Sequence, residues 1–143
     1  MADITYLEDM LVLLANLVEA EWHAFFTSLK WKEKQDYWLN LLNEIRLQRI
    51  QLMKELGIDD LPDESHCTVK HLFSIFVRNE EVGTRYLKDG DVEKAKEYFK
   101  KAFIIFNTIV ELVLPAYEKR NKNPENKSES KAKNILKKAI GIK

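Results

Sequence analysis

The chain has 143 residues, of which 45% are hydrophobic and 32% charged, and its 23 basic and 23 acidic residues leave a formal net charge of zero. This length favours one domain with a buried core, and the balanced charge excludes a global field that would recruit nucleic acid or an anionic membrane. The single cysteine, Cys67, excludes an intrachain disulfide, so a cytoplasmic location is expected. Few Gly and Pro residues with abundant Leu, Lys and Glu favour an all-α fold, and the Lys and Glu content is compatible with a thermophile.

The first predicted helix begins at Thr5, where Thr5 and Glu8 form a capping box in front of an apolar run. The amino-terminal segment carries acidic residues and no basic stretch, which argues against a secretory signal. Its most apolar run, residues 10–20, is too short to cross a bilayer, so we expect no membrane span. One face of this helix is apolar over its whole length and is formed by Leu7, Leu11, Leu14, Val18, Trp22, Phe25 and Leu29.

The second predicted helix runs from Gln35 to about Leu56, after a short link at residues 30–34. Gly57 is a natural stop for it, because glycine accepts the left-handed conformation found just past helix ends. Pro62 suits the first turn of a third helix.

Three tryptophans lie near the link between the first two helices. Trp22 and Trp38 fall on the apolar faces of their helices, so we expect them in the core. Trp31 is flanked by lysines, so we expect it at the surface, where it could anchor an interface.

Residues 67–114 predict two long helices joined by a tight turn at Asp89-Gly90-Asp91, with Asp91 as the cap of the fourth helix. Pro115 lacks a backbone donor, so we expect the fourth helix to kink or end near it. Short connections between long helices favour antiparallel neighbours, and the sequence therefore predicts an antiparallel up-down four-helix bundle. A wide apolar face on the fourth helix is formed by Ala95, Phe99, Ala102, Phe103, Phe106, Ile109, Val110, Val113 and Leu114.

The helix–turn–helix at residues 76–109 combines small and aromatic residues at fixed spacings with a Gly-Asp turn: Val82, Gly83, Tyr86, Gly90, Asp91, Ala95, Phe99 and Ala102. This pattern resembles one tetratricopeptide repeat, a helix–turn–helix unit of about 34 residues. Asn79 and Asn107 depart from the family pattern, which prefers Trp and Pro there. The rest of the chain holds no second copy at the repeat spacing, and one repeat cannot form the concave peptide-binding surface of the family.

The composition changes after Glu118, which divides the chain into a helical bundle domain at 1–120 and a tail at 121–143. The tail consists of a polar linker and a short basic amphipathic helix at residues 130–143. From Glu118 onward, nine basic residues against three acidic ones give a net charge of +6. Such a tail can act as a solubilising extension, fold back onto the acidic body, bind nucleic acid or a partner, or lie on a membrane surface.

Two pairs of potential metal ligands have helical spacing, Glu19 with His23 and Cys67 with His71. Each pair can present two ligands on one helix face, and the four together would suit zinc. In an up-down bundle, however, the two pairs lie about 18 Å apart, at about 1.5 Å per residue. We therefore expect no confident metal or cofactor site from them.

Charged residues interrupt the apolar pattern at Arg49 and Glu80. Because a buried charge is costly unless it is paired, each should have a partner or face a cavity. Arg49 can reach Glu80 if both side chains extend, and Asn107 lies nearly level with Arg49. These residues fit a polar contact that fixes helix register, a bridge between subunits or a ligand pocket.

No Gly-rich phosphate loop, Cys-x-x-Cys pair or nucleophile elbow occurs in the sequence, so no catalytic residue is predicted. We expect a small cytoplasmic interaction or scaffold protein, a homodimer formed through the apolar excess of the first and fourth helices. One alternative is a helical-bundle protein that binds a metal or small ligand, including an enzyme. A second is a nucleic-acid-associated protein that acts through the lysine-rich tail.

Overall fold

The structure is a computed structural model that describes residues 4–122 and residue 141. Over these residues it is all-helical and contains no strand, which confirms the predicted class. Two short 3-10 helices, η1 (Lys32–Lys34) and η2 (Ile58–Asp60), lie in the first two connections. The four long helices are α1 (Ile4–Lys30), α2 (Gln35–Glu55), α3 (Asp63–Lys88) and α4 (Val92–Lys122).

Local signals place the helix ends. Gly57 follows α2 with a φ of 77°, and Gly90 follows α3 with a φ of 83°. After α3, the N–H of Gly90 donates to Leu87 O and that of Asp91 to Tyr86 O, which is the Schellman pattern. Asp91 then caps α4, because its Oδ1 accepts from the N–H of Lys94 at 3.0 Å. The predicted stop at Gly57 and turn at residues 89–91 are therefore confirmed.

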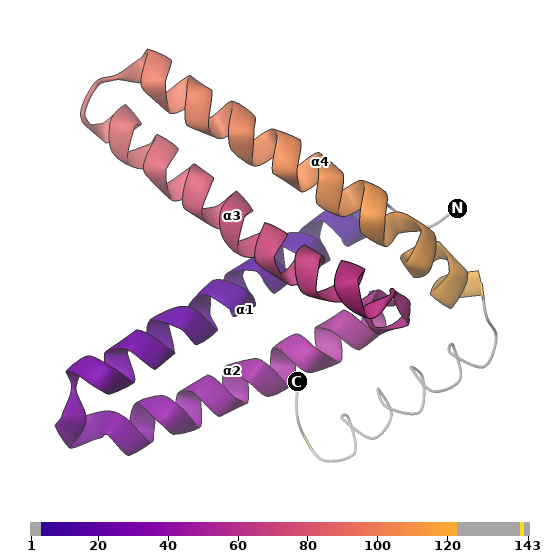
Figure 1. Cartoon of the computed structure of the whole chain (residues 1–143), viewed down its shortest axis with the longest axis horizontal. Coiled ribbons are helices and arrows are strands. Elements are labelled where there is room, and N and C mark those ends of the chain that lie inside the picture. Colours follow the sequence, from indigo (N-terminus) through magenta and orange to yellow (C-terminus); the bar gives the residue numbers. More distant parts are fainter. Residues whose placement is uncertain (1–3, 123–140, 142–143) are drawn as a thin grey trace.

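The helices pair into two antiparallel hairpins, the α1/α2 arm and the α3/α4 arm. Figure 1 shows that the arms meet at one end and diverge toward their tips, residues 31–34 and 89–91. Contact between the arms is made mainly by α1 against α3. The predicted up-down bundle, with four helices side by side along their full length, is not confirmed.

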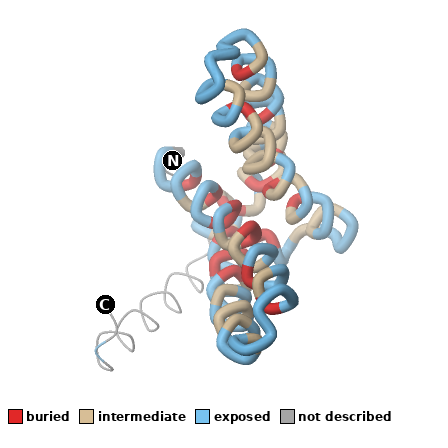
Figure 2. Tube along the Cα trace, turned by 90° about the vertical axis from the view of Figure 1, so that its left-hand side faces the viewer, coloured by how far each residue is buried: buried red, intermediate tan, exposed pale blue. Residues whose placement is uncertain are grey.

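The hydrophobic core lies where the two arms meet. It combines the first half of α1, the end of α2, the first half of α3 and the second half of α4, and Figure 2 shows buried positions densest there. These segments are distant in sequence, so the core, not local propensity, fixes how the arms cross. The buried members are Leu7, Leu11, Leu14, Ala15, Val18, Leu52, Met53, Leu56, Ile58, Val69, Phe73, Ile109, Val113 and Tyr117.

Helix α4 does not end at Pro115, where a kink or an end was predicted. It continues to Lys122 with Pro115 exposed on its outer side. Val113 and Tyr117, on either side of the proline, are buried in the core. Burial of these side chains stabilises the helix through the position where proline removes one backbone hydrogen bond.

The α3/α4 arm is held together by close packing of small and aromatic residues. Gly83 is buried beneath the ring of Phe99, and Ala95 and Ala102 are also buried. Tyr86 and Tyr98 stack across the arm at 5.6 Å between ring centroids. Of the residues that carry the tetratricopeptide resemblance, Gly83, Tyr86 and Phe99 thus lie at the contact between α3 and α4. Gly90 and Asp91 form the turn, and kinship with that family is not confirmed.

The amphipathic helix predicted in the tail falls on residues 130–143, which lie outside the described part of the chain except for Gly141. The same holds for nearly all of the predicted tail at 121–143. None of the helices over residues 4–122 combines the length and the apolar character needed to cross a membrane.

Candidate functional site: the groove between the arms

A groove with a volume of about 710 Å³ lies between the diverging arms. Its size falls in the range of ligand pockets, which is roughly 300–1,000 Å³. One wall comes from α1 and α2 and is largely apolar, while the other comes from α3 and is polar. The lining residues are Val18, Glu19, Glu21, Trp22, Phe25, Leu42, Lys70, His71, Ser74 and Arg78.

A buried carboxylate, Glu19, connects the two walls. Only 6% of Glu19 is exposed, and its Oε1 lies 3.1 Å from Nε of Arg78 on α3. Nη2 of Arg78 also donates a hydrogen bond to Oε2 of Glu19 at 3.4 Å. Arg78 pairs with Glu81 as well, at 3.0 Å. The buried charge of Glu19 is therefore compensated by Arg78 from the facing wall.

A second ion pair joins α1 to α2. Arg49 is buried, and its Nε donates to Oε2 of Glu21 at 2.5 Å. Its Nη1 lies 3.4 Å from the sulfur of Met53. The charge of Arg49 is therefore compensated inside the α1/α2 arm, and α1 is tied to α2 by Glu21 and to α3 by Glu19.

The predicted partners of Arg49 are wrong. Glu80 is exposed, and its carboxylate accepts from the hydroxyl of Thr84 on the next helical turn. Asn107 is exposed on α4. Glu21 was not predicted as the partner of Arg49, although it interrupts the apolar face of α1 in the same way as Arg49 interrupts that of α2. Arg78 lies on the polar side of α3, where no sequence pattern distinguishes it.

The four candidate metal ligands do not come together. Glu19 and His71 line the groove, whereas His23 and Cys67 are exposed and do not line it. Among the residues that the structure describes, no three His, Cys, Asp or Glu side chains are grouped so that they could hold a metal ion. The groove is therefore lined by one residue of each predicted pair, Glu19 and His71. The sequence did not indicate that these two residues would lie at the same site.

The apolar face of α1 changes from buried to exposed along the helix. Leu7, Leu11 and Leu14 are fully buried, but Trp22 is 50% and Leu29 is 51% exposed. Trp22 was predicted in the core, and this prediction is wrong because the α3/α4 arm diverges before it reaches that level. We call the exposed part the α1 stripe, and it consists of Trp22, Phe25, Phe26 and Leu29.

The aromatic members of the α1 stripe contact one another. Trp22 packs edge-on against Phe26 at 4.6 Å between centroids and is stacked on Phe25 at 5.9 Å. Phe25 and Phe26 are themselves in contact at 5.7 Å. Three adjacent, partly exposed aromatic rings are typical of surfaces that bind other proteins.

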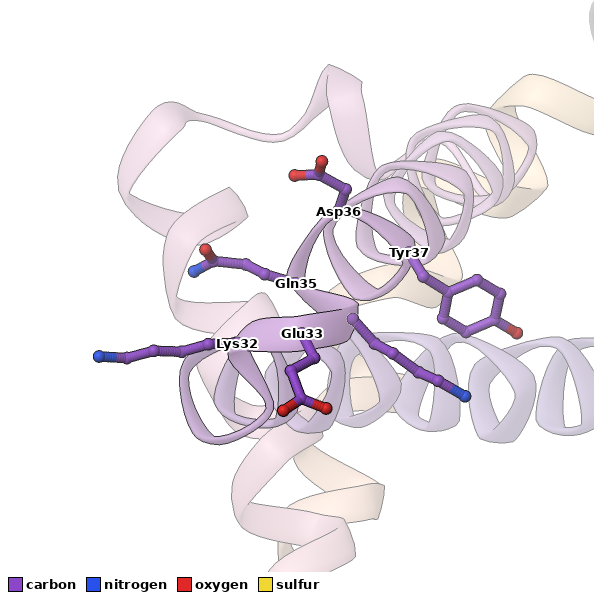
Figure 3. A pocket seen from close by; sticks show the side chains of 6 residues that line it. Lys32, Glu33, Gln35, Asp36 and Tyr37 are labelled. Carbon is purple, nitrogen blue, oxygen red and sulfur yellow. The ribbon is translucent and has the colours of Figure 1, made fainter.

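A second depression lies at the tip of the α1/α2 arm and is formed by residues 32–37. Figure 3 shows that its labelled side chains point away from one another instead of converging on a common point. Such an arrangement cannot surround a ligand, so we do not regard it as a site.

Lys94 and Glu97, whose pKa values are shifted from their ordinary values, lie outside the groove. In the first turns of α4, the ammonium group of Lys94 donates to the carboxylate of Glu97 at 3.1 Å. This hydrogen bond, and then the opposite charge, hold the pKa of Glu97 below its ordinary value and that of Lys94 above its own. Both side chains are solvent-exposed, so the pair is a surface feature of the helix.

Comparison with known proteins gives no relative from which a role could be transferred. No protein-family model, curated protein or solved structure matches this chain. The groove and the α1 stripe are therefore the features of the molecule that point to a function.

Proposed function

We propose that this protein is a small cytoplasmic interaction or scaffold protein that self-associates as a homodimer and works by binding, not by catalysis. One observation carries the proposal: the α1 stripe is apolar, mostly aromatic and about half exposed, with exposed fractions from 39% to 51%. Exposure of contiguous apolar side chains costs free energy that association with another protein recovers.

The fourth helix offers an alternative surface for the proposed dimer. Phe103 is 64% and Ile104 is 53% exposed on α4. These neighbouring residues offer a second apolar surface, separate from the α1 stripe. The proposed tetratricopeptide kinship of the α3/α4 arm is supported by the close approach of α3 to α4 at Gly83.

Sedimentation equilibrium of the purified full-length chain, together with native mass spectrometry, tests this proposal. We expect a reversible monomer–dimer equilibrium in the micromolar range. A chain that stays monomeric at several hundred micromolar would contradict self-association.

A second candidate function, the binding of a small polar ligand, is favoured by the groove. The buried carboxylate of Glu19 lies along it, with Lys70 and His71 on the facing wall. The native mass spectrum tests this candidate too, because a bound molecule adds its mass to each subunit. A bare mass from gently purified protein would contradict it.

A further inference from the structure

We infer that the α1/α2 arm of a second copy of this chain covers the groove, with the two α1 stripes packed against each other about a twofold axis. This inference rests on the proposed self-association and identifies its surface. It selects the α1 stripe over the apolar pair on α4.

The apolar pattern of α1 supports this surface. The α1 stripe continues the helix face formed by Leu11 and Val18, which belong to the core of the same chain. An apolar helix face is normally buried against other apolar side chains along its whole length. The core covers its first half, and the divergence of the arms leaves its second half open (Figure 1).

The position of the stripe places the partner in the groove. Trp22 and Phe25 both line the groove, so a helix that covers them must enter the space between the arms. A twofold axis makes this contact reciprocal, because the same patch serves both copies. Each α1/α2 arm then covers the groove of the other copy, and the two arms together make an intermolecular four-helix packing.

The area of the stripe suits a dimer. With side chains of roughly 150–250 Å² each, the exposed fractions of 50%, 40%, 39% and 51% for Trp22, Phe25, Phe26 and Leu29 leave roughly 350 Å² of apolar surface per copy. Two copies bury roughly 700 Å², which is the lower end of the apolar area in a standard interface. Leu42 and the α3 wall of the groove add to this area.

The charge of the α1/α2 arm permits this pairing. Residues 4–55 carry eight acidic and six basic residues, a formal net charge of −2, so two arms approach with little long-range repulsion. The two carboxylates of the groove, Glu19 and Glu21, are already paired within one copy, with Arg78 and Arg49. Neither carboxylate therefore needs a cation from a partner helix.

The test compares three single variants of the full-length chain by sedimentation equilibrium. Phe26→Asp and Leu29→Asp introduce a charge into the α1 stripe at positions that are 39% and 51% exposed. Phe103→Asp is the matched control, because Phe103 is a 64% exposed phenylalanine on α4, outside the groove. We expect the stripe variants to raise the dimer dissociation constant at least about 30-fold, and the control to leave it within about threefold.

The outcomes separate this inference from the proposed function. A monomeric wild-type chain contradicts both. A wild-type dimer that survives both stripe substitutions, or that is lost with Phe103→Asp, overturns the α1 surface and leaves self-association standing. Circular dichroism confirms the helical content of each variant, and if Phe26→Asp does not fold, Leu29→Asp decides.

Discussion

A methyl group at Gly83 in α3 would lie 2.6 Å from Cε1 of Phe99 in α4, so the missing side chain at position 83 sets the spacing of these two helices. Gly83 is in the middle of a helix, where glycine is less favourable than alanine by about 1 kcal/mol. The close contact with Phe99 offsets this cost by allowing the helices to approach each other.

We expect Gly83→Ala to destabilise the protein by on the order of 1 kcal/mol. Displacing the ring of Phe99 costs about 1–3 kcal/mol, and the helix propensity of alanine returns only about 1 kcal/mol. Urea unfolding measures the difference. The double variant Gly83→Ala with Phe99→Leu should recover most of the loss, and a single variant more stable than wild type would show that the ring yields freely.

Gly57 and Gly90 form a matched pair for a second prediction. Both have a positive φ, 77° and 83°, so alanine at either position costs about 1–2 kcal/mol of backbone strain. A Cβ at Gly57 would also lie 2.8 Å from the carbonyl oxygen of Ala116, whereas a Cβ at Gly90 meets nothing within 4 Å. We expect Gly57→Ala to destabilise more than Gly90→Ala by at least about 1 kcal/mol in urea unfolding. Equal losses would show that the contact with α4 relaxes without cost.

The ion pair of Arg49 and Glu21 gives a third prediction. Their side chains are 9% and 14% exposed, so removing one partner leaves a largely buried charge. We expect Arg49→Met alone to lower the free energy of unfolding by about 3 kcal/mol. The double variant Arg49→Met with Glu21→Leu should lie within about 1 kcal/mol of wild type or above it. A thermodynamic cycle from chemical denaturation gives the coupling, and additive losses would contradict a direct pair.

A fourth prediction concerns the pH dependence of Glu97. Because its pKa in the folded chain is lowered, Glu97 favours folding above its unfolded-state pKa, and the contribution is lost as the pH falls through the folded-state value. Lys94→Gln removes the hydrogen bond and the charge that cause the shift. We expect the pKa of Glu97, followed by NMR titration, to rise toward its ordinary value in this variant. Glu93, which pairs with Lys96 instead, is the internal control.

The interior contacts of the chain were harder to predict than its helices. The sequence indicated that Arg49 needs a partner, but it assigned Glu80 and Asn107, both of which are exposed. That assignment assumed four helices side by side, and in the structure the partner, Glu21, comes from the neighbouring helix of the same arm. A pattern of apolar and charged residues shows that a face is buried without showing which helix covers it.

Only some residues of the candidate site could be predicted from the sequence. Glu19 and His71 were singled out in two separate pairs, and both line one groove. Arg78 was missed, because a basic residue on the polar side of a helix is ordinary until another helix brings a carboxylate to it. The groove itself comes from the angle between the arms, which sequence periodicity does not report.

The sequence by itself determined the four helices and the turns between them. Their ends depend on local chemistry: Gly57 and Gly90 accept a positive φ, and Asp91 caps the helix that follows. Only the tertiary structure decided that the arms diverge and leave Trp22 and Leu29 uncovered. The physical reason is range, because a helix end is set by residues within one turn, whereas a crossing angle is set by how side chains distant in sequence interlock in the core.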